Sequence, residues 1–320
     1  MADVVAGLAV FGVVIAVGWL LVRTRAVPAD ADGVLTRVCF FAATPALLVT
    51  TLSRADLTAV LSRSTAVAVA AELAAIVSAW CLHRLVLRRP TAEATIGALA
   101  SGYVNAANLG IPVAVLVLGD AATIAPILLL QLLVLTPVTF TVLDAVTRRG
   151  NPSRLATLTV PLRNPLLWGV VAGTAANLGG LDLTAWCGGY PAQGLEMLGR
   201  VAVPLMMLAL GMSLAGAPRP LRSPEPDASV RGAGRRSGLW LAVGWKLAVM
   251  PGLAVVVGLA TGLSGAQLLT PVVTATLPTA QNVFMYASRY GVGKDLARDT
   301  VLLTTAGFVP VVLLAAAILR

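Results

Sequence analysis

Long apolar runs dominate the sequence and restrict what the chain can fold into. A helix that crosses the hydrocarbon core of a bilayer needs about 20 mostly apolar residues. Ten candidate spans of this kind are predicted, at residues 4–22, 34–52, 65–83, 95–118, 122–146, 164–178, 191–214, 239–262, 267–288 and 298–319. No alternation of apolar and polar residues with a period of two is sustained, which argues against a β-barrel. We therefore expect an all-α polytopic membrane protein.

The composition agrees with this fold class and excludes some partners. Only 12% of the residues are charged and 58% are hydrophobic, whereas about 25% of a soluble domain is charged. The net charge of +9 suggests nucleic acid at first sight, but the basic residues stand in short clusters between apolar runs, as the flanks of membrane helices do. Nucleic acid is therefore not an expected partner. The three cysteines are far apart and show no metal-binding spacing, so no metal or other cofactor is predicted.

The distribution of arginine and lysine predicts the orientation of the chain. The loops after the first, third, fifth, seventh and ninth spans carry nearly all of the basic residues between spans, whereas the even-numbered loops carry only Arg54 and Arg63. Cytoplasmic loops are enriched in these residue types. The odd-numbered loops are therefore expected in the cytoplasm of a bacterial cell, with both termini outside the plasma membrane.

A cut in the fifth loop leaves five spans in each half, residues 1–150 and 151–320. Because five is an odd number, the second half enters the membrane from the opposite face, so related halves would form an inverted repeat. Prolines inside the spans support such a relation, since they pair at steadily increasing offsets: Pro45 with Pro204, Pro112 with Pro278, and Pro137 with Pro310. Within the second half, the Pro-, Arg- and Gly-rich stretch 215–237 is predicted to be a flexible cytoplasmic loop.

The fourth span contains NAANLGIP (105–112), a poor sequence for a helix in lipid. The ring of Pro112 clashes with the carbonyl of Asn108, four residues earlier, and leaves that carbonyl without its helical partner. Gly110 makes local unwinding easier, so Gly110 and Pro112 are predicted to break the helix. Asn105 and Asn108 share a helix face with Pro112 and are candidate ligands for a substrate or ion.

The ninth span carries a matching interruption in PTAQN (278–282). Pro278 frees the carbonyl of Thr274, and the amide side chains of Gln281 and Asn282 follow one turn later. Interrupted helices at corresponding positions of two repeats are the best sequence indication of a transporter's binding site, and the N-termini of half-helices attract anions. These three polar side chains therefore join the two asparagines of the fourth span as candidate binding residues. The alternative is a pair of proline kinks whose amides bond to neighbouring helices.

Four segments resemble the auxin efflux carrier family in its short bacterial form. They are NLGIP (108–112), RNPLLWGVVAG (163–173), VPLMMLALGMSL (203–214) and PTAQNVFMYASRYG (278–291). The resemblance covers essentially the whole chain. It implies ten helices in two inverted five-helix repeats, with helices four and nine crossing at their prolines, as in bile-acid/sodium symporters and sodium/proton antiporters. It also implies elevator-type transport of a small organic anion such as a carboxylate, a homodimer, and a crossover lined by Asn108, Pro112, Pro278 and Asn282.

Two ionisable residues lie inside predicted spans, Glu72 in the third and Lys246 in the eighth. Charges at this depth are rare and are functional candidates by default, so both are candidate coupling residues. The alternatives are a structural ion pair and side chains that extend to an interface. No acidic pair suited to sodium is evident near the expected crossover, and the choice between proton, sodium and no coupling stays open.

A secondary active transporter fits these features best. An intramembrane enzyme would need a nucleophile with a base, a metal set or paired carboxylates at depth. The only histidine, His83, is instead expected at an interface, and Glu72 is isolated, so no catalytic residue is predicted. The lack of a G-x-x-x-x-G-K-[ST] stretch argues against an ATP-driven pump. A channel or a non-transporting membrane receptor on the same fold is the remaining alternative.

Overall fold

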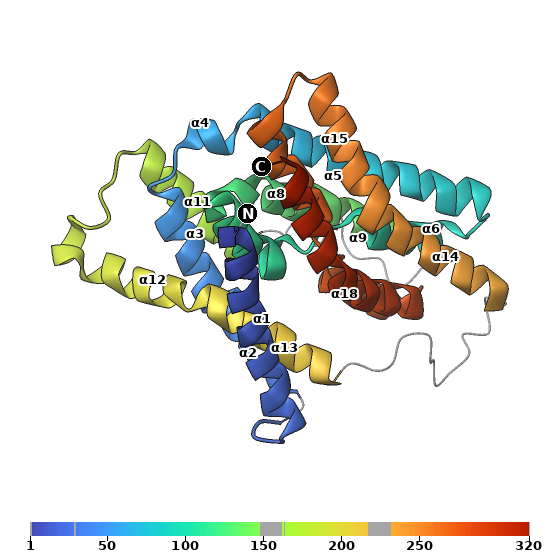
Figure 1. Ribbon diagram of the computed structural model, residues 1–320, viewed down its shortest axis with the longest axis horizontal. Coiled ribbons are helices and arrows are strands. Elements are labelled where there is room, and N and C mark those ends of the chain that lie inside the picture. The colour runs from blue at the N-terminus through green and yellow to red at the C-terminus, as the bar shows by residue number, and fades with distance from the viewer. Residues whose placement is uncertain (1, 29, 148–161, 163, 217–231, 320) are drawn as a thin grey trace. The chain divides into compact units, whose positions relative to one another are not determined.

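The computed structural model describes residues 2–28, 30–147, 162, 164–216 and 232–319 (Figure 1). These residues are predominantly helical, and the one strand-like pairing among them is a single antiparallel bridge between Val104 and Thr279. The expected all-α fold class is thus confirmed. Most of the predicted loop 215–237 lies outside the described residues, as does most of the loop after the fifth span.

Six helical stretches in the described part of the chain are long and apolar enough to cross a bilayer. They are Ala31–Leu52, Arg63–Val86, Ala121–Thr147, Tyr190–Ala215, Arg236–Ala260 and Lys294–Leu319. Each overlaps one of the predicted spans. The other four predicted spans correspond to α1 (Ala2–Arg23), to α11 (Pro165–Leu178) and to two interrupted helices.

The chain forms two compact units, each with its own core. Unit 1 comprises Met1–Ser62, Ala107–Leu132 and Val160–Ala217. Besides α1 and α11, it contains α2 (Ala31–Val38), η1 (Cys39–Ala43), α3 (Thr44–Leu52), α4 (Leu57–Val60), η3 (Ala106–Gly110) apart from its first residue, α7 (Ile111–Val113), η4 (Ala114–Leu118), η5 (Ala121–Ile124), α8 (Ala125–Leu130), η8 (Trp186–Gly189), α12 (Tyr190–Arg200) and α13 (Ala202–Gly216).

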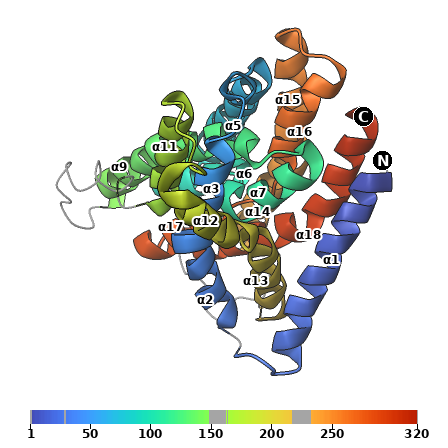
Figure 2. The ribbon, with the colours of Figure 1, turned by 90° about the vertical axis from the view of Figure 1, so that its left-hand side faces the viewer.

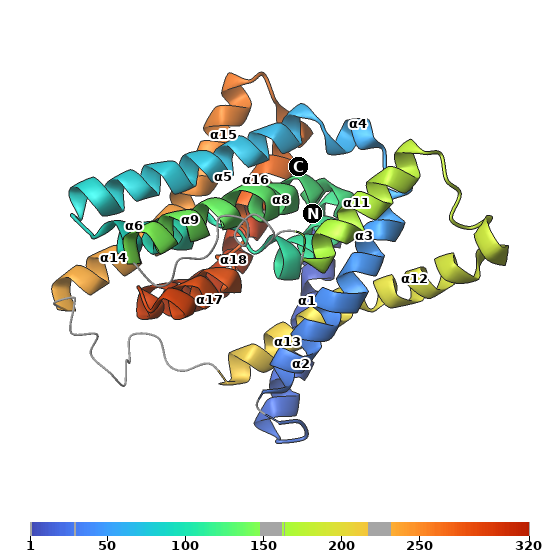
Figure 3. The same ribbon diagram turned by 180° about the vertical axis from the view of Figure 1, so that it is seen from behind.

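Close backbone contact holds the helices of unit 1 together. α1 packs along α13 (Figure 2), and α11 packs along α3 (Figure 3). A Cβ added to Gly18 of α1 would overlap the backbone of Leu208, and a Cβ added to Gly211 of α13 would overlap that of Ile15. At Gly173 of α11, an added Cβ would lie 2.9 Å from a carbonyl oxygen of α3. Small residues permit this approach, and the resulting van der Waals contact stabilises helix pairs in lipid.

Unit 2 comprises Arg63–Ala106, Leu133–Thr159 and Pro218–Arg320. Its helices are α5 (Arg63–Cys81), η2 (Leu82–Val86), α6 (Thr91–Gly102), most of η6 (Gln131–Leu135), α9 (Thr136–Thr147), α14 (Gly232–Gly244), η9 (Trp245–Val249), α15 (Met250–Ala260), η10 (Gly265–Leu268), α16 (Leu269–Thr276), α17 (Gln281–Tyr290) and α18 (Lys294–Leu319). α5 contacts α6, α15 and α16. Its buried residues include several small ones, Ala68, Ala71, Ala75 and Ala79, which are at most 3% exposed.

Each unit takes chain from both predicted halves, 1–150 and 151–320. The predicted repeat relates the first half of the sequence to the second half. Each compact unit, by contrast, is built from segments of both halves. The first two predicted spans of each half go to unit 1 and the third goes to unit 2, whereas the fourth and fifth spans of the first half are each divided between the two units. The inverted repeat of the two halves stays a prediction.

Widened helical turns precede several of the membrane prolines. Among the described residues, the π-helical turns η1, η3, η6 and η9 each end two residues before a proline: Pro45, Pro112, Pro137 and Pro251. Proline removes one N–H and clashes with the carbonyl of the preceding turn, and a π turn with its i→i+5 bonds relieves that clash. The predicted break at Gly110 and Pro112 is therefore wrong. Both residues are helical, and the interruption lies at residues 103–105.

Candidate functional site

Two extended segments, each of which interrupts a helix, meet in unit 2. The first interrupted helix consists of α6, an extended segment at 103–105 and the helical stretch 106–118, and the second consists of α16, an extended segment at 277–280 and α17. We call the two extended segments the crossover. The N–H of Asn105 donates to the carbonyl of Pro278 over 2.8 Å, and the N–H of Ala280 donates to the carbonyl of Tyr103 over 3.1 Å. Each interruption thus satisfies backbone groups that the other leaves free, as hydrocarbon surroundings require.

The half-helices on either side of the crossover are short. α6 has 12 residues and α17 has 10. At a rise of 1.5 Å per residue, they extend about 18 Å and about 15 Å. Half of a hydrocarbon core is about 15 Å thick, so each half-helix is long enough to cross about half of a bilayer.

The two interruptions have different causes. Pro278 disfavours helical geometry at the residue before it, and Leu277 is accordingly extended, with ψ 140°. The carbonyl of Thr274, which the sequence predicted to be free, accepts a bond of 3.2 Å from the N–H of Leu277. The first interruption contains no proline. Tyr103 is extended there, with ψ 107°, and the bonds to the partner segment stabilise that conformation.

Both charged residues that the sequence predicted inside spans lie at the crossover, and both are fully buried. Oε1 of Glu72 on α5 accepts a hydrogen bond of 3.2 Å from the N–H of Val104. Nζ of Lys246 in η9 donates over 3.2 Å to the carbonyl of Ala275, near the C-terminal end of α16. Cations stabilise the C-terminal end of a helix, and a carboxylate is a strong acceptor for a free N–H. Each charge therefore compensates one interruption, and the two also interact with each other electrostatically.

Threonines complete the hydrogen bonding of the crossover. The hydroxyl of Thr279 donates to the carbonyl of Ala100 over 2.6 Å, and its N–H donates to Oγ1 of Thr304 over 3.1 Å. Thr304, on α18, was not among the residues that the sequence singled out, and neither was Tyr103. The only available signal was a polar side chain in an apolar stretch. That signal is weak, because such a threonine commonly bonds its own helix, as Thr304 also does with the carbonyl of Thr300.

The predicted binding residues occupy different positions. Asn105 lies at the crossover and is 7% exposed. Gln281 and Asn282 form the first turn of α17 and are exposed. Asn108 is half-buried in η3 and belongs to unit 1. Thr274 is buried, and its hydroxyl donates to the carbonyl four residues earlier in its own helix.

The start of α17 offers hydrogen-bond donors next to the crossover. Ala280 precedes the helix and provides no side-chain cap, and the first N–H groups of a helix have no intrahelical acceptors. The amides of Gln281 and Asn282 stand beside this positive helix end, an arrangement suited to a carboxylate. The described residues include no group of His, Cys, Asp and Glu that could hold a metal ion. His83, expected at an interface, is buried against Gly97.

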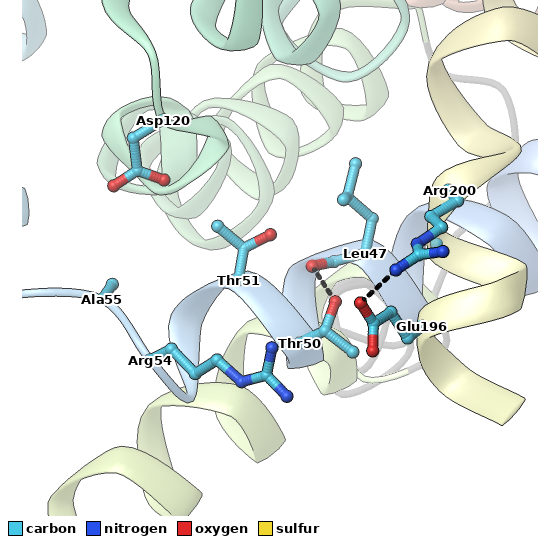
Figure 4. Close-up of a pocket in the computed structure, with 9 residues that line it drawn as sticks. Leu47, Thr50, Thr51, Arg54, Ala55, Asp120, Glu196 and Arg200 are labelled. Atoms are coloured by element: carbon cyan, nitrogen blue, oxygen red, sulfur yellow. Dashed lines mark hydrogen bonds and ion pairs between the residues drawn. The ribbon is translucent and has the colours of Figure 1, made fainter. Parts of the chain in front are cut away.

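Unit 1 contains a separate pocket of about 430 Å³ (Figure 4). Its lining residues are Leu47, Thr50, Thr51, Arg54, Ala55, Asp120, Glu196, Gly199 and Arg200. Arg200 pairs with Glu196 at 2.8 Å. Asn177 fixes the turn that carries Arg54, because its Nδ2 donates to the carbonyls of Leu52, Ser53 and Ala55. Two arginines and two carboxylates balance in charge, so this lining favours neither an anion nor a cation.

Comparison with known proteins relates the whole chain to transporters. The family model described as "Membrane transport protein" matches residues 4–155 and 156–316. A protein of Rhizobium meliloti (strain 1021), named "Putative malonate transporter", is 30% identical over 309 residues, which are 92% of this chain and 89% of that relative. Both findings agree with the resemblance that the four sequence segments indicated. This chain therefore belongs to the membrane transport protein family, the family of the auxin efflux carriers.

Proposed function

We propose that this protein is a secondary active transporter that moves a small organic anion across the plasma membrane and binds it at the crossover. The observation that carries the proposal is the meeting of two interrupted helices at the crossover, joined by the bonds of Asn105 to Pro278 and of Ala280 to Tyr103. In an uninterrupted helix the backbone N–H and C=O groups bond to each other. An interrupted helix has N–H and C=O groups at its inner ends that can bind a solute inside the membrane. Membership of a transport family supports the same conclusion.

A small dicarboxylate is the substrate class that we favour. The Rhizobium meliloti relative is named for malonate, a compound of this class. Gln281 and Asn282 stand at the positive end of α17, and Lys246 adds a buried positive charge at the crossover. We propose Asn282 and Asn108 as the two principal ligands, one from each interrupted helix, and Asn105 as a further ligand.

Ten spans in two inverted five-helix repeats are the topology that we propose, with both termini outside. The packing inside each unit supports it, because equivalent helices of the two halves make equivalent contacts. In unit 1, α1 packs on α13 and α11 packs on α3; in unit 2, α5 packs on α6 and α15 packs on α16. The counterparts under the repeat are α1 and α11, α3 and α13, α5 and α15, and α6 and α16. Replacing each helix by its counterpart turns the contact of α1 with α13 into that of α11 with α3, and the contact of α5 with α6 into that of α15 with α16.

An elevator-type mechanism suits a chain built from two units with separate cores. The unit that carries the crossover would move relative to unit 1, whose glycine-mediated helix contacts make it a suitable rigid frame. A homodimer is proposed on the family resemblance alone. For coupling, we propose that the ammonium group of Lys246 supplies the positive charge that a bound metal ion would otherwise supply at the C-terminal end of α16. We propose that Glu72 binds the proton if transport is coupled to protons.

Uptake of radiolabelled malonate into proteoliposomes tests the proposal. Asn282→Ala and Asn108→Ala should each lower the uptake rate at least about tenfold, because each removes a hydrogen bond to a charged group, worth about 1.5–3 kcal/mol. The melting temperature should stay close to that of the unaltered protein. Gln193→Ala, which removes an exposed amide on α12, is the matched control and should transport normally. Unchanged uptake in both asparagine variants would refute the assigned site.

The same preparation separates a transporter from a channel. A channel only dissipates a gradient, so it cannot raise internal malonate above electrochemical equilibrium. A transporter coupled to protons should accumulate malonate when a pH gradient is applied at zero membrane potential. If the unaltered protein moved none of a panel of mono- and dicarboxylates, the substrate class would be wrong.

A further inference from the structure

Arg289 is a cation that aromatic rings hold in place. It lies in the last turn of α17, and its guanidinium carbon is 4.9 Å from the ring centre of Phe140 and 5.6 Å from that of Tyr290. Phe140 is only 6% exposed and is itself fixed by an edge contact with Tyr286, at 5.0 Å between ring centres. The hydroxyl of Tyr290 donates to Asp144 over 2.7 Å. The side chain of Arg289 therefore rests on a rigid support.

No carboxylate among the described residues forms an ion pair with Arg289, because the nearby acids have other partners. Asp144 accepts from Tyr290, and Asp295 and Asp299 pair with Arg298 at 3.3 Å and 2.7 Å. A guanidinium carries five N–H donors in a planar fork, and contact with an aromatic ring leaves such donors for other partners. Arg289 is exposed, so these donors stay available to an anion.

The position of Arg289 on α17 relates it to the crossover. Asn282, Tyr286 and Arg289 follow one another at spacings of four and three residues, which places them along one face of the helix. The rise from Asn282 to Arg289 is about 10 Å, seven residues at 1.5 Å each. The face begins at the crossover with an amide and ends with a cation at the membrane surface that the loop charges assign to the cytoplasm.

We propose that Arg289 binds a carboxylate group of the transported anion on the cytoplasmic approach to the crossover, and so contributes to the selection of anions. This inference rests on the proposed function. Arg289 acts before the anion reaches Asn282, because about 10 Å of helix is too long for one small dicarboxylate to bridge. Its contribution therefore belongs to capture from, or release to, the cytoplasm.

Sided transport kinetics test the proposal. Proteoliposomes are prepared in which an impermeant reagent blocks all carriers of one orientation, and malonate kinetics are measured from each face. Arg289→Gln should raise the KM on the cytoplasmic face about tenfold, the low end of the loss expected for one charge-assisted hydrogen bond, and change the KM on the outer face less than about twofold. Arg289→Lys keeps the charge without the planar fork and should raise the cytoplasmic KM about threefold.

Two further variants separate binding from other roles of the charge. Lys294→Gln removes an exposed cation five residues away that has no aromatic support, so it should leave both KM values within about twofold. Phe140→Leu removes the nearer of the two supporting rings and should raise the cytoplasmic KM about threefold, with no further increase when combined with Arg289→Gln.

The outcomes distinguish failure of the proposed function from failure of the role assigned to Arg289. If the unaltered protein carries no malonate, the proposed function fails. If it carries malonate and Arg289→Gln leaves the cytoplasmic KM unchanged, the inference about Arg289 is overturned. The inference also fails if the variant alters only the dependence of transport on anionic lipid, since Arg289 would then contact phospholipid head groups. If Arg289→Gln does not fold but Arg289→Lys melts at the normal temperature, the cytoplasmic KM of Arg289→Lys decides the test.

Discussion

Neutralising Lys246 should reveal that the two buried charges compensate each other. In Lys246→Met, the carbonyl of Ala275 loses its donor and Glu72 loses a nearby positive charge. Removing one partner of a buried charge pair costs about 3–5 kcal/mol. Glu72→Gln should cost a similar amount. The amide oxygen can still accept from the N–H of Val104, but the ammonium group then stays buried without its opposing charge.

The double variant Lys246→Met/Glu72→Gln separates charge compensation from capping. It leaves no buried charge at the crossover, and the main remaining loss is one unsatisfied carbonyl, about 1–3 kcal/mol. The double variant should therefore be more stable than the sum of the single losses predicts, by about 3 kcal/mol or more. With about 2–4 °C in melting temperature per kcal/mol for a large domain, each single variant should melt about 6 °C or more below the unaltered protein, and the double variant closer to it.

Melting in detergent, followed by the fluorescence of a thiol-reactive dye or by light scattering, measures these differences. The same cycle at an exposed pair is the control. Arg200 and Glu196 lie 2.8 Å apart with side chains that are 77% and 39% exposed, so their coupling should stay below about 1 kcal/mol. Strictly additive losses for Lys246 and Glu72 would show that the two residues act only as independent caps, and would refute the reasoning.

Two pairs of substitutions follow from the geometry of the helices. Gly18→Ala places a Cβ against the backbone of Leu208 and should lower the melting temperature by about 4 °C or more. Gly12→Ala, on the same helix with open space around it, should be neutral or stabilising. Equal melting temperatures of the two variants would contradict the close contact at Gly18. Pro112→Ala should keep malonate uptake within about twofold, because Pro112 widens a helix that stays intact, while Pro278→Ala should lower it at least about tenfold by favouring a continuous helix through the crossover. A larger loss from Pro112→Ala than from Pro278→Ala would reverse the assignment of the breaks.

The elements of this fold that depend on local sequence could be predicted well. Apolar runs of sufficient length gave helices at every predicted span, because the cost of exposing backbone groups to lipid leaves few alternatives. The structure has an extended segment at Pro278, where the sequence placed a break, since proline acts on its own turn and on the residue before it. Glu72 and Lys246 stood out for the same reason, as charges inside apolar runs.

The parts that depend on contacts between distant segments were not predictable in this way. The break at Tyr103 has no local cause, because the donors and acceptors that stabilise it belong to Pro278 and Ala280. The sequence assigned the break to Pro112, where a π turn absorbs the clash and the helix continues. The backbone targets of Glu72 and Lys246, and the role of Thr304, likewise became evident only when the packing of α5, η9 and α18 against the crossover was known.

The bonds between the two extended segments also set the order in which the protein can mature. Asn105 and its acceptor Pro278 are separated by roughly 170 residues of chain. Synthesis proceeds at about 5–20 residues per second, so the first interruption is made about 10–30 s before its partner exists. During that interval the N–H of Asn105 and the carbonyl of Tyr103 lack the partners that they have in the folded protein. The N-terminal half thus enters the membrane as an unfinished structure, and the ninth span, when it arrives, completes a helix that was inserted five spans earlier.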